Sequence, residues 1–396
     1  MVDGDGLILG AMPATILLVT TMDWPFPAQL AGAFTAVGAR VEALCSKGSM
    51  MSLSRHPQRF HPYQPLSPDG SLRRAIVQSQ PDFIIPCDDL AAEFVTRVAG
   101  GPDLSDRHDF LARAARVGAP ARSMALADED GVNDAIRCYG LPLVLKCDHS
   151  WGGAGVVIAA TRQDALAAFR RFRKTSRLRD LARFIRRGES HFLSRALLPV
   201  TPAVSAQPFI DGHPATSSIA CWQGGIVAAN HFDVLVTSAA TGPACVVARR
   251  DCPQMENTAA VIAKDLNLSG LFGLDYVRDR NGKVHLLEIN ARATPTAHLM
   301  LKQDLPAALL QAANLPARSR LPMTAKDEVA IFPREWMRDP ASPWLKNAYH
   351  DVPWDDPQVV RACVRAARPA DLAAAQAQLE EGKSAALTTK SAVFGG

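Results

Sequence analysis

The sequence lacks the features that would place it in a membrane, in a secretory pathway or among zinc proteins. No apolar run reaches the roughly 18–20 residues that a membrane span requires. The apolar stretch 7–12 is short and follows Asp3 and Asp5 instead of basic residues, which argues against a secretory signal. The eight cysteines form no C-x-x-C pair and no zinc-type spacing with histidine, so we expect reduced thiols in a cytoplasmic protein.

The sequence also has no large excess of positive or of negative residues. The 396 residues carry a net charge of +4, which is too small to imply a nucleic-acid partner. A hydrophobic content of 48% is typical of a globular protein, and the length allows two or three domains of roughly 150 residues. The segment 170–187 has nine Arg or Lys residues against one acid, but its only aromatic residues are Phe172 and Phe184. Such a run is typical of a solvated helix face.

The first hundred residues have the pattern of an open α/β unit. Two β-branched or apolar runs, 15–20 and 40–44, flank a helical pattern at 28–37, which is one βαβ crossover. A further strand is expected at 83–86. No G-x-G-x-x-G follows the first strand, which argues against a dinucleotide-binding dehydrogenase.

Two loops of this unit are candidate ligand contacts. Parallel sheets bind ligands beyond the carboxyl ends of their strands, which here means residues 20–24 and 87–89. Helix N-capping by Asp88 or Asp89 explains the acids equally well. A cluster of glycine and proline at 100–102 then indicates a domain boundary.

A lysine and a glycine-rich loop follow this boundary. A buried strand at 142–146 ends in Lys146, and Gly152, Gly153 and Gly155 come shortly after it. Glycines let the backbone approach a ligand closely and direct its N–H groups at phosphate oxygens, while the lysine adds a positive charge. A phosphate-binding loop is one interpretation, and a simple hairpin turn is the other.

A second hairpin carries two carboxylates. The runs 271–278 and 284–289 are expected strands, and Asn281-Gly282 is the strongest signal for a two-residue turn. If Arg280 pairs with Lys283, the two residue numbers of every opposed pair add up to 563, because each step back along one strand is a step forward along the other. Asp275 then lies opposite Glu288, where like charges destabilise a sheet unless a cation lies between them.

The hairpin is therefore a candidate metal site. Asn290 shares the face of Glu288, because side chains alternate with period two. Two carboxylates and an amide oxygen suit Mg²⁺, which binds through one or two carboxylates plus substrate phosphates. The alternative is a surface hairpin with polar residues on its solvent side.

The order of these parts resembles the ATP-grasp superfamily, which includes biotin carboxylase, carbamoyl-phosphate synthetase, D-alanine-D-alanine ligase and the L-amino-acid ligases. The resemblance covers roughly residues 15–310, and its most specific part is Asp275 with the sequence Glu-Ile-Asn-Ala-Arg at 288–292. It implies an α/β chain with a Rossmann-like pre-ATP-grasp domain at 1–104. An ATP-grasp domain of two α+β lobes clamping ATP would follow at 105–310, with a flap lobe at about 141–205. Beyond the resemblance, the pattern of residues 311–396 predicts a small C-terminal domain.

The resemblance also implies roles for single residues. Arg107 and Lys146 would contact ATP phosphates beneath a flap of Gly152, Gly153 and Gly155, and Gln207, Pro208, Phe209 and Ile210 would form the adenine-binding hinge. Asp275, Glu288 and Asn290 would bind two Mg²⁺ ions, with Mn²⁺ as a substitute, and Arg292 would steady the transferred phosphoryl group. Arg107 stands where many relatives have a lysine. Arg249, Arg250 and His298 are open between substrate contacts and structural pairing.

The activity implied is that of an ATP-dependent carboxylate-amine ligase that forms an amide or peptide bond through an acyl phosphate. Its partners would be small-molecule carboxylate and amine substrates, with no nucleic acid and no membrane, and a homodimer is compatible with the resemblance. Two alternatives stay open. One is an ATP-dependent carboxylase or carbamoyl-phosphate-type enzyme that uses bicarbonate, and the other is a non-catalytic nucleotide-binding regulatory module.

Overall fold

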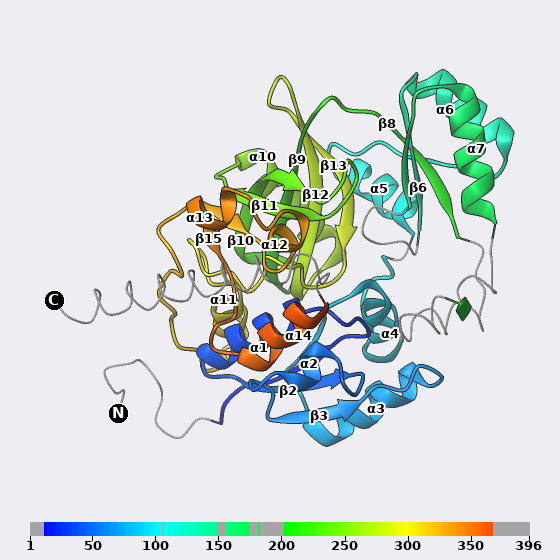
Figure 1. Ribbon diagram of the computed structural model, residues 1–396. Coiled ribbons are helices and arrows are strands. Elements are labelled where there is room, and N and C mark those ends of the chain that lie inside the picture. Colours follow the sequence, from blue (N-terminus) through cyan, green and yellow to red (C-terminus); the bar gives the residue numbers. More distant parts are fainter. Residues whose placement is uncertain (1–11, 105, 149–154, 175–180, 183–201, 367–396) are drawn as a thin grey trace.

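A computed structural model describes residues 12–104, 106–148, 155–174, 181–182 and 202–366 (Figure 1). The N-terminal unit is a parallel four-stranded sheet with the order β3-β2-β1-β4. Its strands are β1 (Thr15–Val19), β2 (Arg40–Cys45), β3 (Arg59–Pro62) and β4 (Phe83–Pro86), and its helices are α1 (Phe26–Ala36), α2 (Met50–Leu53), α3 (Pro68–Ser79) and α4 (Asp89–Ala99). The predicted open α/β unit is thus confirmed. The order of the sheet reverses between β1 and β4, which brings the loops after these strands together.

A small antiparallel sheet follows, with the order β5-β8-β6-β7. It consists of β5 (Met124–Ala125), β6 (Leu143–Cys147), β7 (Val156–Ala159) and β8 (Val204–Pro208), and α6 (Glu129–Tyr139) and α7 (Arg162–Arg173) cover its outer face (Figure 1). Thr161 and Asp164 form the capping box of α7 that the sequence predicts. The lobe has its own apolar core, centred on Leu143, Leu145 and Phe169.

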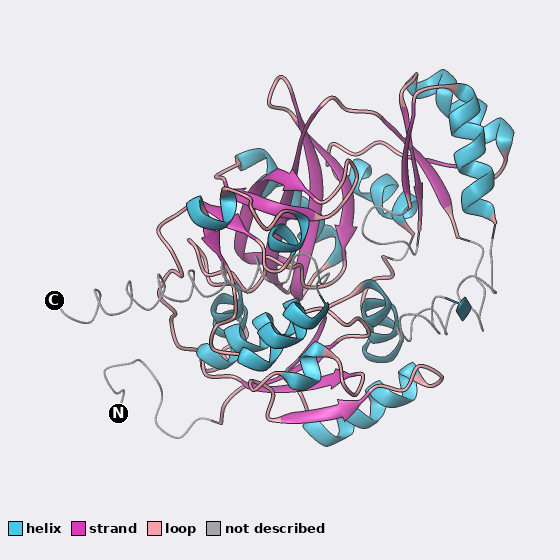
Figure 2. Cartoon of the chain, viewed as in Figure 1, coloured by secondary structure: helices cyan, strands magenta, loops and turns pink. Residues whose placement is uncertain are grey.

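A seven-stranded sheet forms the centre of the molecule, and Figure 2 shows it as a strand group separate from the small sheet. Its order is β13-β12-β9-β10-β11-β14-β15. The strands are β9 (Gly212–Trp222), β10 (Gly225–Thr237), β11 (Ala244–Arg249), β12 (Gly270–Asp279), β13 (Val284–Asn290), β14 (Glu328–Ala330) and β15 (Tyr349–His350). The helices are α5 (Arg107–Arg116), α10 (Pro253–Leu266), α11 (Leu305–Ala312), α12 (Arg334–Arg338), α13 (Trp344–Asn347) and α14 (Pro357–Ala366).

One apolar core joins the N-terminal unit to the large sheet. It contains Phe34 of α1, Leu271 of β12, Leu309 of α11 and Trp336 of α12, all buried. Strands β14 and β15 come from the predicted C-terminal domain, and they extend the large sheet instead of forming a sheet of their own. The predicted domain boundaries themselves stay predictions. Among the described helices, none is both long and apolar enough to cross a membrane.

Candidate active site

The hairpin of β12 and β13 pairs Asp275 directly with Glu288, as the sequence predicts. Its turn differs from the predicted one. The Asp279 N–H donates to the Lys283 carbonyl at 2.9 Å, so the loop has three residues, 280–282, and it ends at Gly282 with a φ of +80°. The predicted two-residue turn is therefore wrong, because residues next to the loop pair one position away from the expected register.

A β-bulge at Leu287 restores the predicted opposition. Tyr276 pairs with Leu286, whereas Asp275 pairs with Glu288, so Leu287 is one extra residue on β13. The carbonyl of Leu287 accepts a hydrogen bond from Nε2 of Gln207 at 3.0 Å. The bulge thus sets the register of the two carboxylates and connects the hairpin to the end of β8.

The carboxylate of Asp275 is surrounded by polar groups, and the positive charge near it does not offset its burial and the charge of Glu288. Its Oδ1 accepts from the Thr216 hydroxyl at 2.7 Å, and its Oδ2 accepts from Nδ2 of Asn290 at 2.9 Å. Burial, and then the negative charge of Glu288, raise the pKa of Asp275. A cation between the two carboxylates would remove this repulsion.

Glu288 lies against two basic side chains. Arg107 Nε donates to its Oε2 at 3.0 Å, and Lys146 Nζ donates to the same atom at 3.4 Å. Burial by itself would raise the pKa of Glu288, but the charges of Lys146 and Arg107 outweigh it and lower this pKa to about 2. Burial also lowers the pKa of Lys146, an effect that Glu288 opposes. The predicted phosphate lysine and the predicted metal ligand are thus in contact.

Asp148 is a site residue that our reading of the sequence missed. Its Oδ1 accepts from Nη1 of Arg107 at 2.6 Å, and its Oδ2 accepts from the Arg107 backbone N–H at 3.3 Å. Asp148 follows Lys146 by two residues, so the alternation of side chains along a strand places both on one face. That spacing was a usable signal.

Arg292 connects the hairpin to the N-terminal unit. Its Nε donates to Oδ1 of Asp89 at 2.6 Å, and its Nη2 donates to Oδ1 of Asn290 at 3.0 Å. The guanidinium carbon lies 5.9 Å from the centroid of the Trp24 ring. Asp89 acts against the effect of burial and raises the pKa of Arg292, so the side chain is a fixed positive charge.

The two acids after β4 have different roles. Asp88 is the N-cap of α4, since its carboxylate accepts from the Ala91 N–H at 2.9 Å. It also accepts from the hydroxyls of Thr20 and Thr21, in the loop after β1, at 2.9 and 2.8 Å. Asp88 therefore holds the two predicted ligand loops together, and Asp89 reaches the candidate site.

The remaining predicted nucleotide contacts fall on the flap and the hinge. Gly152 and Gly153 lie outside the described residues, and the carbonyl of Gly155 accepts from the Cys147 N–H at 2.8 Å. Gln207 is buried and Pro208 ends β8, after which Phe209 is 40% exposed and Ile210 is half-buried. The Oε1 atom of Gln207 is buried with no hydrogen-bond partner among the described residues. Contact of these residues with a nucleotide stays a prediction.

Three residues left open by the sequence have structural partners. Arg249 pairs with Asp327 at 2.7 Å and Arg250 pairs with Asp233 at 2.8 Å. His298 is buried, and its Nε2 lies 3.1 Å from the carboxylate of Asp351. The contacts of Arg249 and Arg250 favour structural pairing over substrate binding. Neither ring nitrogen of His298 makes a hydrogen bond to a described residue, so its role stays open.

The donors at the hairpin fit Mg²⁺ bound together with phosphates. Among the described residues no group of three or more His, Cys, Asp or Glu side chains could hold a metal. The predicted ligands at the hairpin are two facing carboxylates and the amide of Asn290, and their role as metal ligands stays a prediction. Mg²⁺ commonly binds through one or two carboxylates and completes its shell with water and phosphate oxygens. The negative excess around Asp275 supports the same interpretation.

The low pKa of Glu288 predicts a stability effect that depends on pH. Its ionised form is stabilised in the folded protein, so its contribution of a few kcal/mol is complete above its ordinary pKa of 4.5 and is lost as the pH falls toward 2. We expect metal-free Glu288→Gln to melt below the wild type at pH 7, and the gap to close from about pH 4.5 downward. Calorimetry at pH 7, 5, 4 and 3 tests this. Asp275→Asn is the opposite-sign control, because the raised pKa of Asp275 destabilises the fold at neutral pH.

No protein-family model matches the sequence, and no curated protein matches it. Solved structures do match, and one is N5-carboxyaminoimidazole synthetase from Staphylococcus aureus, at a TM-score of 0.57 and 12% identity over 78% of this chain and 79% of that chain. Another is the biotin carboxylase domain of the Hydrogenobacter thermophilus 2-oxoglutarate carboxylase. Its TM-score is 0.56 and its sequence identity is 13%, over 78% of this chain and 71% of that chain. At such low identity the likeness concerns the fold, and the chain therefore has the ATP-grasp fold that its sequence predicts.

Proposed function

We propose that this protein is an ATP-dependent carboxylate-amine ligase that acts on small metabolites through an acyl phosphate. The observation that carries the proposal is the cluster in which Asp275 and Glu288 face each other. Lys146 and Arg107 donate hydrogen bonds to Glu288. Asn290 donates to Asp275 and accepts from Arg292, so it connects this arginine to the cluster. Positive and negative side chains from α5, β6 and β13 meet there, as a reaction that moves a phosphoryl group requires.

The similar structures support a nucleotide at this cluster. The Staphylococcus aureus synthetase is described as a complex with ADP, and the Hydrogenobacter thermophilus domain as a complex with MgADP and bicarbonate. In this chain Lys146, Arg107 and the loop that contains Gly152, Gly153 and Gly155 would face the phosphates, and residues 207–210 would face the adenine. Asp275, Glu288 and Asn290 would hold one or two Mg²⁺ ions, or Mn²⁺. When bound, these ions would supply positive charge that offsets the negative charge of the phosphates.

The reaction converts a poor electrophile into a good one. A carboxylate oxygen attacks the γ-phosphorus of ATP, the bond from that phosphorus to the bridging oxygen breaks, and ADP leaves. The amine nitrogen then attacks the acyl carbon and loses a proton, and the bond from carbon to the phosphate oxygen breaks. Arg292 is suited to hold the transferred group, because its planar fork is always charged and Asp89 fixes its orientation.

A bicarbonate-dependent carboxylation is the second candidate. The bicarbonate in the Hydrogenobacter thermophilus complex favours it, and that domain is also described as a dimer. The two reactions share the phosphorylation of a carboxylate group and differ in the acid that is phosphorylated.

Oxygen labelling separates the two candidates. Pairs of carboxylic acids and amines are first screened for phosphate release and for product mass. The active acid is then supplied with ¹⁸O in its carboxylate, and we expect one ¹⁸O per turnover in the released phosphate. Unlabelled phosphate together with ADP release that requires bicarbonate would establish the carboxylase instead. Binding of MgATP without turnover in any pair would leave a regulatory module.

A further inference from the structure

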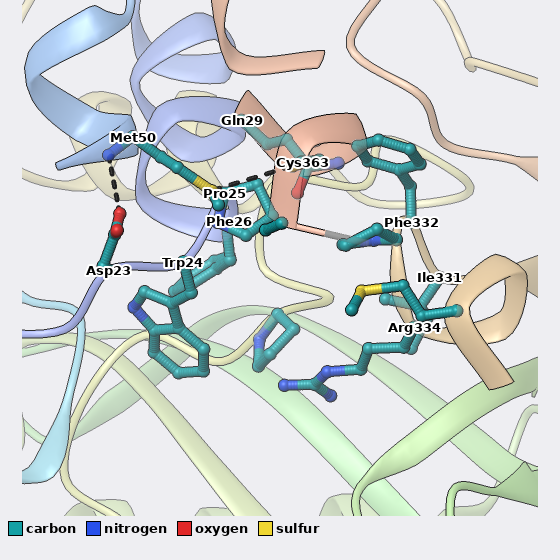
Figure 3. A pocket seen from close by; sticks show the side chains of 14 residues that line it. Asp23, Trp24, Pro25, Phe26, Gln29, Met50, Ile331, Phe332, Arg334 and Cys363 are labelled. Atoms are coloured by element: carbon teal, nitrogen blue, oxygen red, sulfur yellow. Dashed lines mark hydrogen bonds between the residues drawn. The ribbon is translucent and has the colours of Figure 1, made fainter. Parts of the chain in front are cut away.

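A pocket of about 250 Å³ lies between the N-terminal unit and the segment after β14 (Figure 3). Trp24 and Phe26 line it from the loop after β1 and the start of α1, and Phe332 and Met337 line it from the other side. Most of its wall is apolar. Asp23 and Trp24 of this wall belong to the loop 20–24, which the sequence predicts as a ligand contact, whereas none of the residues of the hairpin cluster lines the pocket.

The pocket contains a positive charge without a carboxylate partner. Nη1 of Arg334 donates to the Ala244 carbonyl at 3.2 Å, and no Asp or Glu of the described chain lies within ion-pair distance of this guanidinium. Arg338, one turn later on α12, is instead paired with Glu335 at 2.6 Å. Burial and the nearby charge of Arg292 lower the pKa of Arg334 to about 10, so it stays protonated at neutral pH.

The other charged residue of the wall is already engaged. Oδ1 of Asp23 accepts from the Met50 N–H at 2.7 Å, at the end of the pocket away from Arg334 (Figure 3). The guanidinium of Arg334 extends toward the side of Trp24. The end of the pocket at Arg334 is therefore positive and suits an anion, whereas a protonated amine there would be repelled by both Arg334 and Arg292.

The pocket also adjoins the residue that we place at the phosphoryl group. Trp24 lines the pocket, and its ring lies 5.9 Å from the guanidinium carbon of Arg292. Pro295, three residues after Arg292, lines the pocket as well. A molecule held against Trp24 thus has one end beside the candidate reaction centre.

We infer that this pocket selects the carboxylate substrate, and that this substrate is a small acid with an aromatic or branched apolar body. The carboxylate would face Arg334 on the side of Arg292, and the apolar body would pack against Trp24, Phe26 and Phe332. The volume is below the usual range for ligand pockets, about 300–1,000 Å³, which restricts the substrate to small molecules. The identification as a substrate site rests on the proposed ligase activity.

Equilibrium binding tests the inference without turnover. We expect calorimetry to detect 3-phenylpropanoate binding to the nucleotide-free wild type, and Arg334→Gln to weaken it roughly tenfold or more, since a charge-assisted hydrogen bond is lost. Arg334→Lys keeps the charge and is expected to retain most of the affinity. Arg365→Gln removes an exposed arginine of α14, next to the lining residue Ala366, and should change nothing. Acetate, which lacks the apolar body, and the uncharged 3-phenylpropanamide should both bind weakly to every variant.

Two measurements keep the pocket and the ligase separate. If MgADP binds but 3-phenylpropanoate does not bind, or binds wild type and Arg334→Gln equally, the pocket inference is overturned and the ligase proposal stands. If binding depends on Arg334 but no pair of acid and amine gives turnover, the anion-binding pocket is supported and the ligase proposal fails. Melting temperatures of all variants show whether a loss of binding reflects a damaged fold.

Discussion

Glu288→Gln is expected to reduce ATP turnover by about 10²–10³-fold or more, which is the range for loss of one group that stabilises charge in a transition state. The substitution keeps the shape of the side chain and removes the charge that faces Asp275 across the hairpin. One carboxylate is then left to hold Mg²⁺, so both metal affinity and turnover should fall. ADP release in a coupled assay, over a series of Mg²⁺ concentrations, measures the two effects.

The same substitution should lower stability, and this separates it from a neutral change. Lys146 loses its anionic partner, whereas Arg107 keeps Asp148, and the loss of the carboxylate beside the buried Lys146 costs about 1–3 kcal/mol. Glu256→Gln on the exposed face of α10 is the control, and it should leave turnover unchanged and lower the melting temperature only slightly, since an acid in the first helical turn contributes about 0.3–1 kcal/mol. Normal ADP release by Glu288→Gln would refute the metal assignment, whatever its stability.

The hairpin illustrates how far sequence patterns reach. Period two and an Asn-Gly signal predict the two strands correctly, whereas the predicted facing of Asp275 and Glu288 is correct only because two local differences compensate each other. The local details differ, because Gly282 closes a three-residue loop and Leu287 forms a bulge, and these two shifts cancel at the site. Turn type depends on backbone geometry that several loop lengths can satisfy with the same two residues.

Contacts between distant segments could not be predicted in the same way. Thr216 reaches Asp275 only because β9 lies beside β12, and Asp89 reaches Arg292 only because the N-terminal unit packs against the large sheet. Arg334 is one of many arginines in the sequence. Its significance comes from its place in the wall of an apolar pocket, where no described carboxylate lies within ion-pair distance of its guanidinium, and this place depends on the fold of residues after 311.

Arg292→Lys is expected to lower kcat by about 10²-fold while the KM for ATP changes little. A lysine keeps the charge but replaces the planar fork by a single ammonium nitrogen, so it does not reproduce the two separate bonds from Nε to Asp89 and from Nη2 to Asn290. The transferred phosphoryl group should be held in a less favourable geometry, which lowers kcat. The other contacts to the nucleotide should stay intact, so the KM for ATP changes little. Steady-state kinetics with ATP as the varied substrate measures both constants.

Asp89→Asn provides the second arm of this experiment. Asp89 lies in the N-terminal unit and positions Arg292, so its loss should cost about tenfold in kcat, which is less than the change at Arg292 itself. The double variant should be no slower than Arg292→Lys alone, because residues that act as a unit are not additive. Additive losses would mean that Asp89 acts on the substrate directly.

Arg97→Lys is the control for a change at an arginine-carboxylate pair. Arg97 pairs with Asp69 at the surface, and surface pairs contribute little to stability. A non-additive pair would establish that the N-terminal unit sets the geometry of the reaction centre through one ion pair.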